Sequence, residues 1–216
     1  ATDSLHPRPH RHSAHTSRWG AVAARTTGCQ THREVAGGLS FPVGCKNGTD
    51  GNLQIASAAM GAACHPHSFL GINNEGRISI VRTTGNDDVH IVLRGGNDHP
   101  NYEAADIAQV MKKLKDSSID TSIMVDCSHA NSNKNHELQP LVMDNVANQI
   151  LEGNNSIVGL MVESHLGWGN QSIPENLADL KYGVPVTDAC IDWDTTAELL
   201  AGCYQQLAGP LKARIG

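Results

Sequence analysis

Ser122-Ile-Met-Val-Asp-Cys-Ser-His-Ala-Asn-Ser-Asn-Lys134 is the stretch that decides the fold, because a short apolar run in it ends in a polar cluster. The run Ile123–Val125 is too short for a helix and is typical of a strand covered on both faces. The stretch Ile157–His165 repeats this design, since its apolar run stops at Glu163. Two apolar strands that each end in a metal-capable side chain are typical of an α/β active site.

The rest of the chain contains further copies of the same unit. Three more strands are predicted at residues 20–25, 41–46 and 90–95. A helix is predicted after each of the five strands, with the first two at residues 30–36 and 52–64. Regular alternation of strands and helices implies a parallel sheet. Residues 69–84 differ from this series and are predicted to form an inserted β-hairpin. Apolar residues mark one face on each of the last three helices: Ile107, Val110, Met111 and Leu114, then Leu138, Leu141, Val142, Val146 and Ile150, then Leu200, Cys203, Tyr204, Leu207 and Leu211.

Bulk composition excludes several classes of protein. A net charge of −6 over 216 residues argues against a general nucleic-acid binder. No apolar run approaches the roughly 20 residues that span a bilayer, and we expect a cytoplasmic protein with no membrane partner. None of the six cysteines forms a C-x-x-C pair, which favours buried reduced thiols. Residues 1–18 are rich in histidine and poor in apolar residues, so they are predicted to be a disordered or unrelated leader before a domain at 19–216.

All five predicted strands end on or near a charged or metal-capable side chain: Arg25, Lys46, Arg94, His129 and Glu163. The carboxyl ends of parallel strands lie on one face of a sheet, where ligands bind. The three cations would bind phosphate and carboxylate groups. A histidine and a glutamate, together with Asp188, would bind a divalent ion such as Mn²⁺, Fe²⁺, Co²⁺ or Zn²⁺. Each of these residues also has a purely structural explanation. The arginines and the lysine could be solvated loop residues, the histidine could be a hydrogen-bonded structural group, and the glutamate could cap the next helix. These alternatives stay open.

From residue 19 onward the chain resembles the class I 3-deoxy-D-arabino-heptulosonate 7-phosphate (DAHP) synthases. The most specific shared motifs are KNGTDG, SHANS, ESH, GNQS and TDACI. The stretches that match, in order along the chain, are WGAVAARTT (19–27), GLSFPVGCKNGTDG (38–51), HIVLRGG (90–96), PNY (100–102), MVDCSHANSNK (124–134), GLMVESHLGWGNQS (159–172) and YGVPVTDACIDW (182–193). The motif spacings fit this family better than the related eight-carbon sugar acid synthases.

The resemblance implies a TIM-type (β/α)8 barrel, of which this chain holds about five units. It implies the condensation of phosphoenolpyruvate with erythrose 4-phosphate, the first step of the shikimate pathway. Site roles come from the same resemblance. Arg25, Arg94 and the backbone at Ala24 would bind the phosphoenolpyruvate phosphate, and Lys46 would act in substrate binding and catalysis.

The resemblance also implies a metal site. His129, Glu163 and Asp188 would be metal ligands, with His129 counted among the catalytic residues and Asp188 also among those that contact substrate. The family's fourth ligand, a cysteine in a G-P-C-S motif, has no counterpart in this sequence. We therefore expect the C-terminal portion of the enzyme.

Other properties of the family are expected only by resemblance. They are assembly into a homo-oligomer and inhibition by an aromatic amino acid near Ser40, Phe69 and Val81. A competing hypothesis is a truncated, non-catalytic relic that binds phosphate anions or pairs with a full-length subunit.

Overall fold

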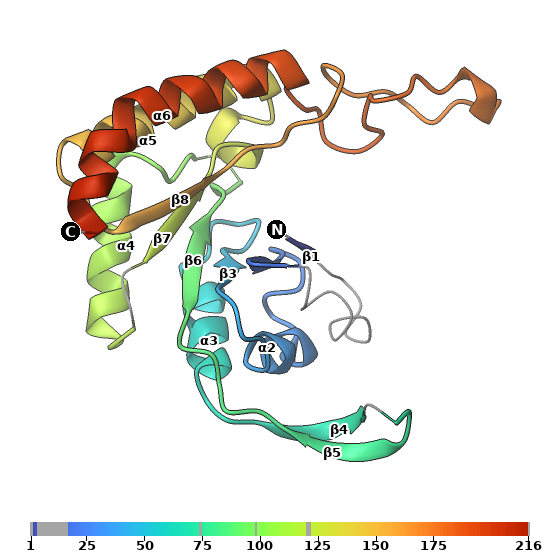
Figure 1. Ribbon diagram of the computed structural model, residues 1–216, viewed down its shortest axis with the longest axis vertical. Coiled ribbons are helices and arrows are strands. Elements are labelled where there is room, and N and C mark those ends of the chain that lie inside the picture. Colours follow the sequence, from blue (N-terminus) through green and yellow to red (C-terminus); the bar gives the residue numbers. More distant parts are fainter. Residues whose placement is uncertain (1, 4–16, 74, 98, 120–121, 216) are drawn as a thin grey trace. The chain divides into compact units, whose positions relative to one another are not determined.

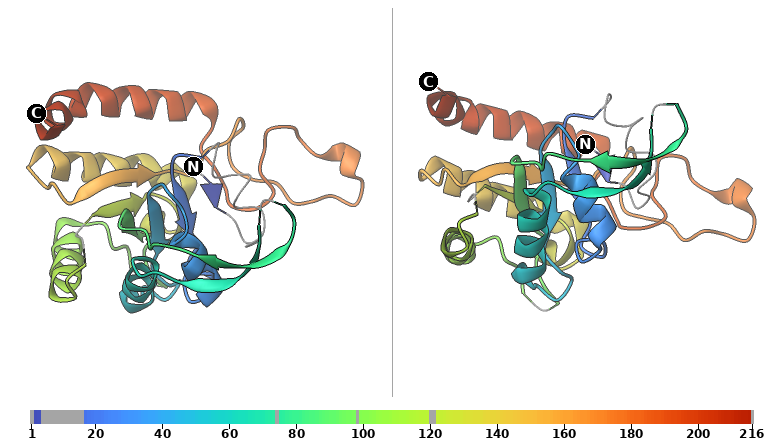
Figure 2. Two further views of the ribbon diagram at one scale, coloured as in Figure 1. Left: turned by 60° about the horizontal axis from the view of Figure 1, so that its bottom comes forward. Right: turned by 90° about the horizontal axis from the view of Figure 1, so that it is seen from below.

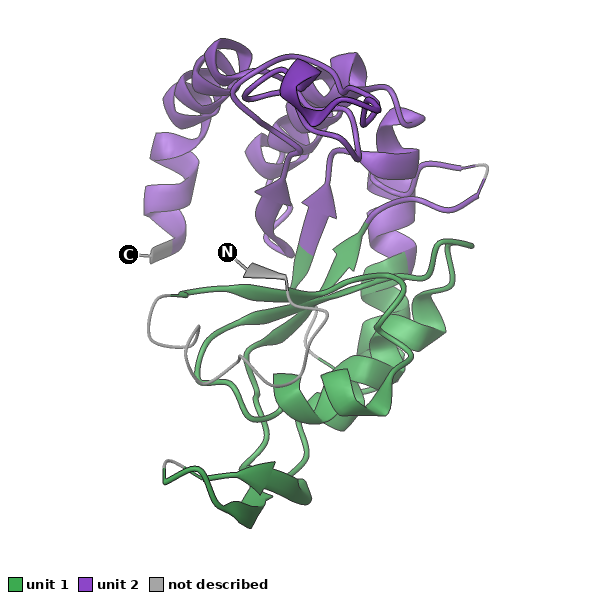
Figure 3. Ribbon diagram, turned by 90° about the vertical axis from the view of Figure 1, so that its right-hand side faces the viewer, with its two compact units in different colours: residues 1–93, 110–123 green, residues 94–109, 124–216 purple. Residues whose placement is uncertain are grey.

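A computed structural model describes residues 2–3, 17–73, 75–97, 99–119 and 122–215. The chain forms two compact units, coloured separately in Figure 3. The first unit comprises residues 1–93 and 110–123, and the second comprises residues 94–109 and 124–216. Each unit is described by itself below.

Parallel strands and two helices make up the first unit (Figure 1). The strands lie side by side in the order β1 (Thr2–Asp3), β2 (Gly20–Val22), β3 (Val43–Lys46) and β6 (Val89–Leu93). The register pairs Gly20 with Val43 and Val43 with Val89. The helices are α2 (Gln30–Ala36) and α3 (Leu53–Ala63). The predicted parallel α/β arrangement is confirmed.

The core of this unit lies between α3 and the strands. All five residues of β6 are buried, as expected for a central parallel strand. Helix α3 packs on β3 and β6 through small side chains, which let the helix approach the sheet closely. Asn52 caps α3 by accepting a hydrogen bond from the Gln54 backbone nitrogen at 2.8 Å, so the helix begins one residue after its predicted start.

The predicted hairpin is confirmed as β4 (Ser68–Ile72) paired with β5 (Ile78–Arg82), seen from two further sides in Figure 2. Exposure alternates along both strands, because neighbouring side chains point to opposite faces of a strand. Phe69 and Val81 are cross-strand partners on the half-buried face. The other face presents four exposed aliphatic side chains: Leu70, Ile72, Ile78 and Ile80.

The second unit carries the two strands that the sequence singled out. Strand β7 (Ile123–Asp126) begins with the last residue of the first unit, and β8 (Ile157–Met161) is its neighbour. The Cys127 nitrogen donates to the Met161 carbonyl at 2.8 Å, which keeps both chain segments together beyond the strand ends. Helices α5 (Gln139–Leu151) and α6 (Trp193–Ile215) pack against each other. The remaining elements are α4 (Ala104–Asp116), which crosses the boundary between the units, and the short 3-10 helices η1 (His129–Ser132), η2 (His136–Leu138) and η3 (Leu177–Asp179).

The five predicted strands are all shorter in the structure, and β2 and β8 end before their functional side chains. Strand β2 ends at Val22, because the Ala23 carbonyl accepts hydrogen bonds from the backbone nitrogens of Thr26 and Thr27 at 2.9 Å and starts a turn. Arg25 therefore lies in that turn rather than on the strand. Strand β8 likewise stops at Met161, two residues before Glu163. Arg25 and Glu163 therefore both lie in the loops that follow their strands.

The predicted apolar faces are only partly buried. Ile107, Val110 and Leu114 on α4 are buried as the pattern indicates. On α5 the inclusion of Leu141 in the face is wrong, since its side chain is 63% exposed. On α6, Leu207 is buried, but Leu200, Tyr204 and Leu211 are exposed. Helix periodicity identifies an apolar stripe, whereas its burial depends on how much neighbouring structure covers it.

The cysteines and the N-terminal segment complete the description. All six cysteines are free thiols, and Cys45, Cys127 and Cys190 are buried. Burial raises the pKa of Cys45 to about 12, whereas a hydrogen bond with the His32 side chain lowers the pKa of Cys29 to about 7. Of the predicted leader, residues 4–16 lie outside the described residues, and Thr2 and Asp3 pair with β2. Within the described parts of the chain, no helix has the length and apolarity to cross a membrane.

Candidate metal centre

Three of the predicted site residues come together in the second unit. His129 lies three residues after β7, Glu163 lies two residues after β8, and Asp188 lies in the loop between β8 and α6. One ligand atom from each side chain lies within 4.8 Å of the other two. Residues from three separate chain segments are thus near enough to bind a single ion.

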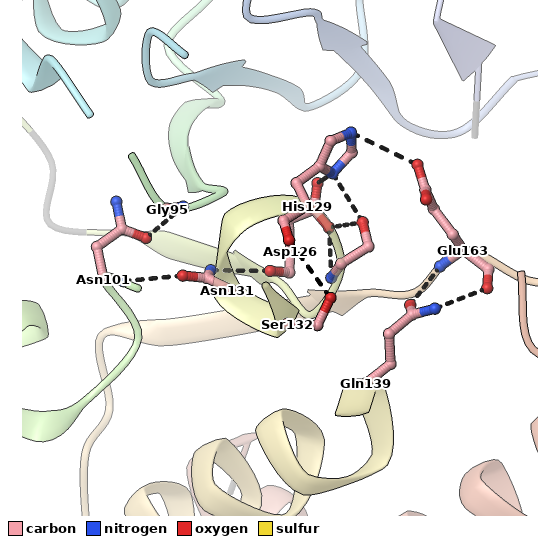
Figure 4. A network of polar contacts seen from close by, with 9 residues as sticks. Gly95, Asn101, Asp126, His129, Asn131, Ser132, Gln139 and Glu163 are labelled. Atoms are coloured by element: carbon pink, nitrogen blue, oxygen red, sulfur yellow. Dashed lines mark hydrogen bonds and ion pairs between the residues drawn. The ribbon is translucent and has the colours of Figure 1, made fainter. Parts of the chain in front are cut away.

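The backbone turns sharply at His129, where φ is 56°, in the left-handed region. This conformation costs a residue other than glycine about 1 kcal/mol or more, and such strain is concentrated at functional sites. The turn is closed by a hydrogen bond from the Lys134 nitrogen to the His129 carbonyl at 2.6 Å. It directs the imidazole toward Glu163, with Nε2 at 3.5 Å from Glu163 Oε1 (Figure 4).

The other ring nitrogen of His129 is held by two neighbours (Figure 4). Nδ1 lies 3.0 Å from Asp126 Oδ2 and 2.7 Å from Ser128 Oγ. The Asp126 carboxylate is fully buried and also accepts hydrogen bonds from the backbone nitrogen and the hydroxyl of Ser128. An ionised carboxylate only accepts hydrogen bonds, so Nδ1 carries the hydrogen.

Gln139 fixes the backbone of Glu163 with both ends of its side-chain amide (Figure 4). Its Oε1 accepts from the Glu163 nitrogen at 2.7 Å, and its Nε2 donates to the Glu163 carbonyl at 3.1 Å. The same carbonyl also accepts from the Ile191 nitrogen at 3.1 Å. Gln139 is fully buried at the start of α5, so a rigid element positions the Glu163 loop.

Backbone pairing also holds the segment that carries Asp188. Cys190 and Gly169 exchange hydrogen bonds at 2.8 and 3.0 Å, as in an antiparallel strand pair. Asn170 donates its side-chain amide to the Thr187 carbonyl at 2.8 Å. Asp188 is itself exposed, and these contacts on both sides of it define where its carboxylate lies.

The charge of the cluster favours a cation. Nδ1 carries a hydrogen, so Nε2 is the ring nitrogen whose lone pair, in an uncharged His129, points to the Glu163 carboxylate. Two electron-rich atoms that face each other, with Asp188 beside them, are the donor set of a divalent ion. The chemistry of these three ligands therefore fits a borderline divalent metal with open coordination positions.

Cys190 lies beside this cluster and is not part of it. Burial, with a further contribution from the charges of Glu163 and Asp188, raises the pKa of its thiol to about 11. The thiol therefore stays protonated at neutral pH. Among the described residues, no cysteine joins the group of candidate ligands.

A second set of contacts, all within the second unit, links the site to the loop that begins at Arg94. Asn101 accepts from the Gly95 nitrogen at 2.7 Å, and the Asn101 nitrogen donates to Asn131 Oδ1 at 2.8 Å. Asn131 donates in turn to the Asp126 carbonyl at 2.9 Å. The Arg94 carbonyl also accepts from the Ala130 nitrogen at 3.2 Å. The loops that carry Arg94 and His129 are therefore joined within this unit.

Most of the sequence matches a known family. The profile of the DAHP synthetase I family matches residues 1–201. The chain belongs to the DAHP synthetase I family. The family predicted from the sequence motifs is confirmed.

Relatives in this family are about 50% identical to the chain over the aligned residues. It is 50% identical to the "Phospho-2-dehydro-3-deoxyheptonate aldolase, Tyr-sensitive" of Escherichia coli K12 over 215 residues, which is 100% of this chain and 60% of that protein. It is 51% identical over 197 residues to the protein of the same name from Enterobacter agglomerans, covering 91% of this chain and 92% of that sequence. The chain therefore spans about 60% of the length of the full relatives that it matches.

A solved structure from the family has the same fold. The "Phospho-2-dehydro-3-deoxyheptonate aldolase" of Francisella tularensis SCHU S4 superposes with a TM-score of 0.88 and 39% sequence identity, covering all of this chain and 61% of that chain. The α/β class predicted from the sequence agrees with this likeness. The expectation that the chain is the C-terminal portion of a family member stays a prediction.

The remaining predicted site residues lie in different places. Arg94 is buried, with 8% exposure, directly after β6 in the second unit. Lys46 is the half-buried last residue of β3, Ala24 is half-buried, and Arg25 is exposed; all three belong to the first unit. The grouping of all five strand-end side chains at one site stays a prediction.

Two of the predicted regulatory residues are neighbours, since Phe69 and Val81 form a cross-strand pair in the hairpin. Ser40 is exposed in the segment that follows α2. That segment passes the end of the hairpin, because a Cβ on Gly38 would lie 3.0 Å from the Thr83 side chain. All of these residues belong to the first unit.

Sequence reasoning missed the residues that support the metal cluster. Asp126 and Ser128 stand in the opening motif, but the sequence gives no sign that they contact Nδ1 of His129. Gln139 was not predicted either, because a glutamine at the start of a helix is normally a surface residue. Only the folded backbone brings it to Glu163, 24 residues along the chain.

Proposed function

We propose that the protein is a DAHP synthase, a transferase of aromatic amino acid biosynthesis. The reaction joins phosphoenolpyruvate to erythrose 4-phosphate and water, and it gives 3-deoxy-D-arabino-heptulosonate 7-phosphate and inorganic phosphate. The observation that carries this proposal is the cluster of His129, Glu163 and Asp188 in a chain of the DAHP synthetase I family. The reaction class comes from the names of the two aldolases described above, from Escherichia coli and Enterobacter agglomerans.

The fold proposed for the whole enzyme is a (β/α)8 barrel, of which this chain supplies five βα units. The order of elements supports it, because β2, β3, β6, β7 and β8 are each followed by a helix. In such barrels the loops after the strands form the active site. The candidate ligands and Arg94 all lie in loops of this kind.

His129, Glu163 and Asp188 would hold one divalent ion, with Mn²⁺, Fe²⁺, Co²⁺ and Zn²⁺ as candidates. When bound, the ion supplies a Lewis acid that polarises the aldehyde of erythrose 4-phosphate. Three protein ligands leave coordination positions open for substrate, which is typical of catalytic rather than structural metal sites. His129 contributes Nε2, because Nδ1 is occupied by Asp126 and Ser128.

The cationic residues would bind the phosphates and the carboxylate of the substrates. Arg94 suits the phosphoenolpyruvate phosphate, because a buried guanidinium can donate two parallel hydrogen bonds to phosphate oxygens. Arg25 and the Ala24 backbone would complete this subsite. Lys46 would lie on the phosphate or carboxylate side of phosphoenolpyruvate and stabilise charge there during carbon–carbon bond formation.

A turnover measurement tests the proposal. The purified 216-residue chain, mixed with both substrates and Mn²⁺, is expected to consume phosphoenolpyruvate and release inorganic phosphate only when erythrose 4-phosphate is present. Glu163→Gln keeps the size of the ligand and removes its charge, so it should reduce kcat/KM by at least about 100-fold. Glu152→Gln removes a charge from an exposed residue and serves as the matched control.

The competing function is a non-catalytic relic that binds phosphate anions through the same cations or pairs with a full-length subunit. Isothermal titration separates the two functions. The synthase requires Mn²⁺ binding that Glu163→Gln abolishes, whereas the relic binds phosphate and needs no metal. Phosphate binding without Mn²⁺ binding or turnover would favour the relic.

Regulation, assembly and location are part of the same proposal. An aromatic amino acid would bind near Ser40, Phe69 and Val81, a choice supported by relatives described as "Tyr-sensitive" or "Phe-sensitive". The intact enzyme would be a cytoplasmic homo-oligomer that binds neither nucleic acid nor membrane. Six free thiols support the reducing location.

A further inference from the structure

A buried carboxylate lies directly behind the candidate ligand His129. Asp126, the last residue of β7, has no exposed surface, and its Oδ2 lies 3.0 Å from His129 Nδ1. The position of this carboxylate is fixed by the strand and by Ser128, which donates to Oδ1 from both its backbone nitrogen and its hydroxyl. The His129 ring is therefore oriented by a rigid group rather than by solvent.

We propose that Asp126 is the positioning residue of the metal centre, because it keeps the hydrogen on Nδ1 of His129 and leaves the Nε2 lone pair for the ion. This inference rests on the proposed function, since it assigns a role to a residue behind the proposed ligand. Histidines that bind metals commonly donate their second nitrogen to a carboxylate, and loss of that partner weakens metal binding by about 10–100-fold.

Geometry fixes the direction of this hydrogen bond. Ser128 already donates its hydroxyl hydrogen to Asp126 Oδ1, so Ser128 Oγ can accept from His129 Nδ1 but has no second hydrogen to donate. Both groups facing Nδ1 are therefore acceptors. Only a ring with a hydrogen on Nδ1 satisfies them, and when that ring is uncharged its lone pair is at Nε2, toward Glu163.

Asp126→Asn tests the role of Asp126 directly. The variant keeps the shape of the side chain but places a donor instead of an acceptor against His129 Nδ1. The backbone nitrogen and hydroxyl of Ser128 both donate to the Oδ1 position, so the amide oxygen of the variant will take that place. The amide nitrogen then occupies the Oδ2 position and donates to His129 Nδ1. The ring must accept there, its hydrogen moves to Nε2, and the nitrogen that faces the metal position is blocked.

The experiment measures the histidine tautomer and the metal affinity separately. Long-range ¹H–¹⁵N correlation spectra of the ¹⁵N-histidine-labelled chain, at about pH 8 where an ordinary histidine is neutral, report which nitrogen carries the hydrogen. His129 is assigned by the signal that His129→Gln removes. We expect the Nδ1–H form in the unsubstituted protein and the Nε2–H form in Asp126→Asn. In an electron paramagnetic resonance titration with Mn²⁺ alone, Asp126→Asn should bind about 10–100-fold more weakly.

Two further variants separate positioning from general damage. Ser128→Ala removes one acceptor but keeps the carboxylate, so the Nδ1–H form should persist with a smaller loss of Mn²⁺ affinity. Asp144→Asn removes a charge from an exposed residue of α5 and should change neither readout. If Asp126 had only a structural role, the hydrogen of the His129 ring would stay on Nδ1 in Asp126→Asn.

Several results would overturn the inference. An Nε2–H tautomer of His129 in the unsubstituted protein would do so even if Asp126→Asn failed to fold. A folded Asp126→Asn variant that kept the Nδ1–H form, or bound Mn²⁺ within twofold of the original affinity, would do so as well. If the unsubstituted chain bound no Mn²⁺, the metal site of the proposed function would fail, whereas the tautomer would still decide the role of Asp126.

Discussion

Replacing Gln139 with leucine should destabilise the protein and loosen the metal centre together. Gln139 is fully buried, and both of its amide atoms bond to the backbone of Glu163, at 2.7 and 3.1 Å. Leucine is of similar volume and fills the site without making either hydrogen bond. The variant therefore removes the contact that fixes the Glu163 loop to α5 and leaves the core filled.

The expected loss follows from the groups left without their partner. Two hydrogen bonds contribute about 1 kcal/mol each, and a partly buried Glu163 N–H deprived of its acceptor adds about 1–3 kcal/mol. Burial of the apolar leucine side chain offsets about 1 kcal/mol or more of this. We expect the free energy of unfolding to fall by about 2–3 kcal/mol. Mn²⁺ affinity should fall as well, because the Glu163 backbone loses its support.

Gln149 provides a matched control on the same helix. It is also buried, and its Nε2 donates to the Tyr102 carbonyl at 2.8 Å, but its Oε1 is buried with no hydrogen-bond partner among the described residues. Gln149→Leu loses this contact and a second one, from Nε2 to Oδ1 of the exposed Asn145 at 2.8 Å, but it also removes the unsatisfied oxygen. Water can replace the partner of Asn145, so the substitution should cost only about 0–1 kcal/mol. Urea denaturation followed by circular dichroism measures both variants. Equal losses for Gln139→Leu and Gln149→Leu would refute the reasoning.

Three further predictions concern other parts of the fold. Cys29, with a pKa of about 7, should be about half thiolate at pH 7 and should react with iodoacetamide faster than Cys45. The reaction rate of Cys29 should rise with pH through 7 and then level off. Mass spectrometry of the labelled peptides measures both rates, and equal rates would contradict the prediction. Leu93→Ala should lower the free energy of unfolding by about 2–5 kcal/mol in urea denaturation, because Leu93 is fully buried, and a loss below about 1 kcal/mol would mean that the site collapses. Gly95→Ala should cost at least about 2 kcal/mol in the same assay, since φ is +76° and the new Cβ would lie 2.8 Å from the Asn131 nitrogen; an unchanged midpoint would show that the loop rearranges freely.

Much of the fold could be predicted because it is encoded locally. The short apolar runs and the glycine- and asparagine-containing turns identify the strands, the hairpin and the helix starts without knowledge of their neighbours. Helix α2 has its predicted bounds, Gln30–Ala36, and α3 differs by one residue at each end. Errors occur where burial depends on distant segments. Leu141 and Tyr204 fit an apolar stripe but are exposed, because no described segment covers that side of either helix.

The candidate site likewise has a part that the sequence predicts and a part that it does not. His129, Glu163 and Asp188 could be chosen from the sequence, because side chains that follow apolar strands are directed to one end of a parallel sheet. By itself, the sequence determined the alternation of strands and helices, the family and the chemical type of the ligands. Only the tertiary structure decided which nitrogen of His129 faces Glu163 and which buried residues hold each ligand in place. The physical reason is that hydrogen bonds such as that of Gln139 to Glu163 depend on distances and directions between segments far apart in the chain, and residue order does not record them.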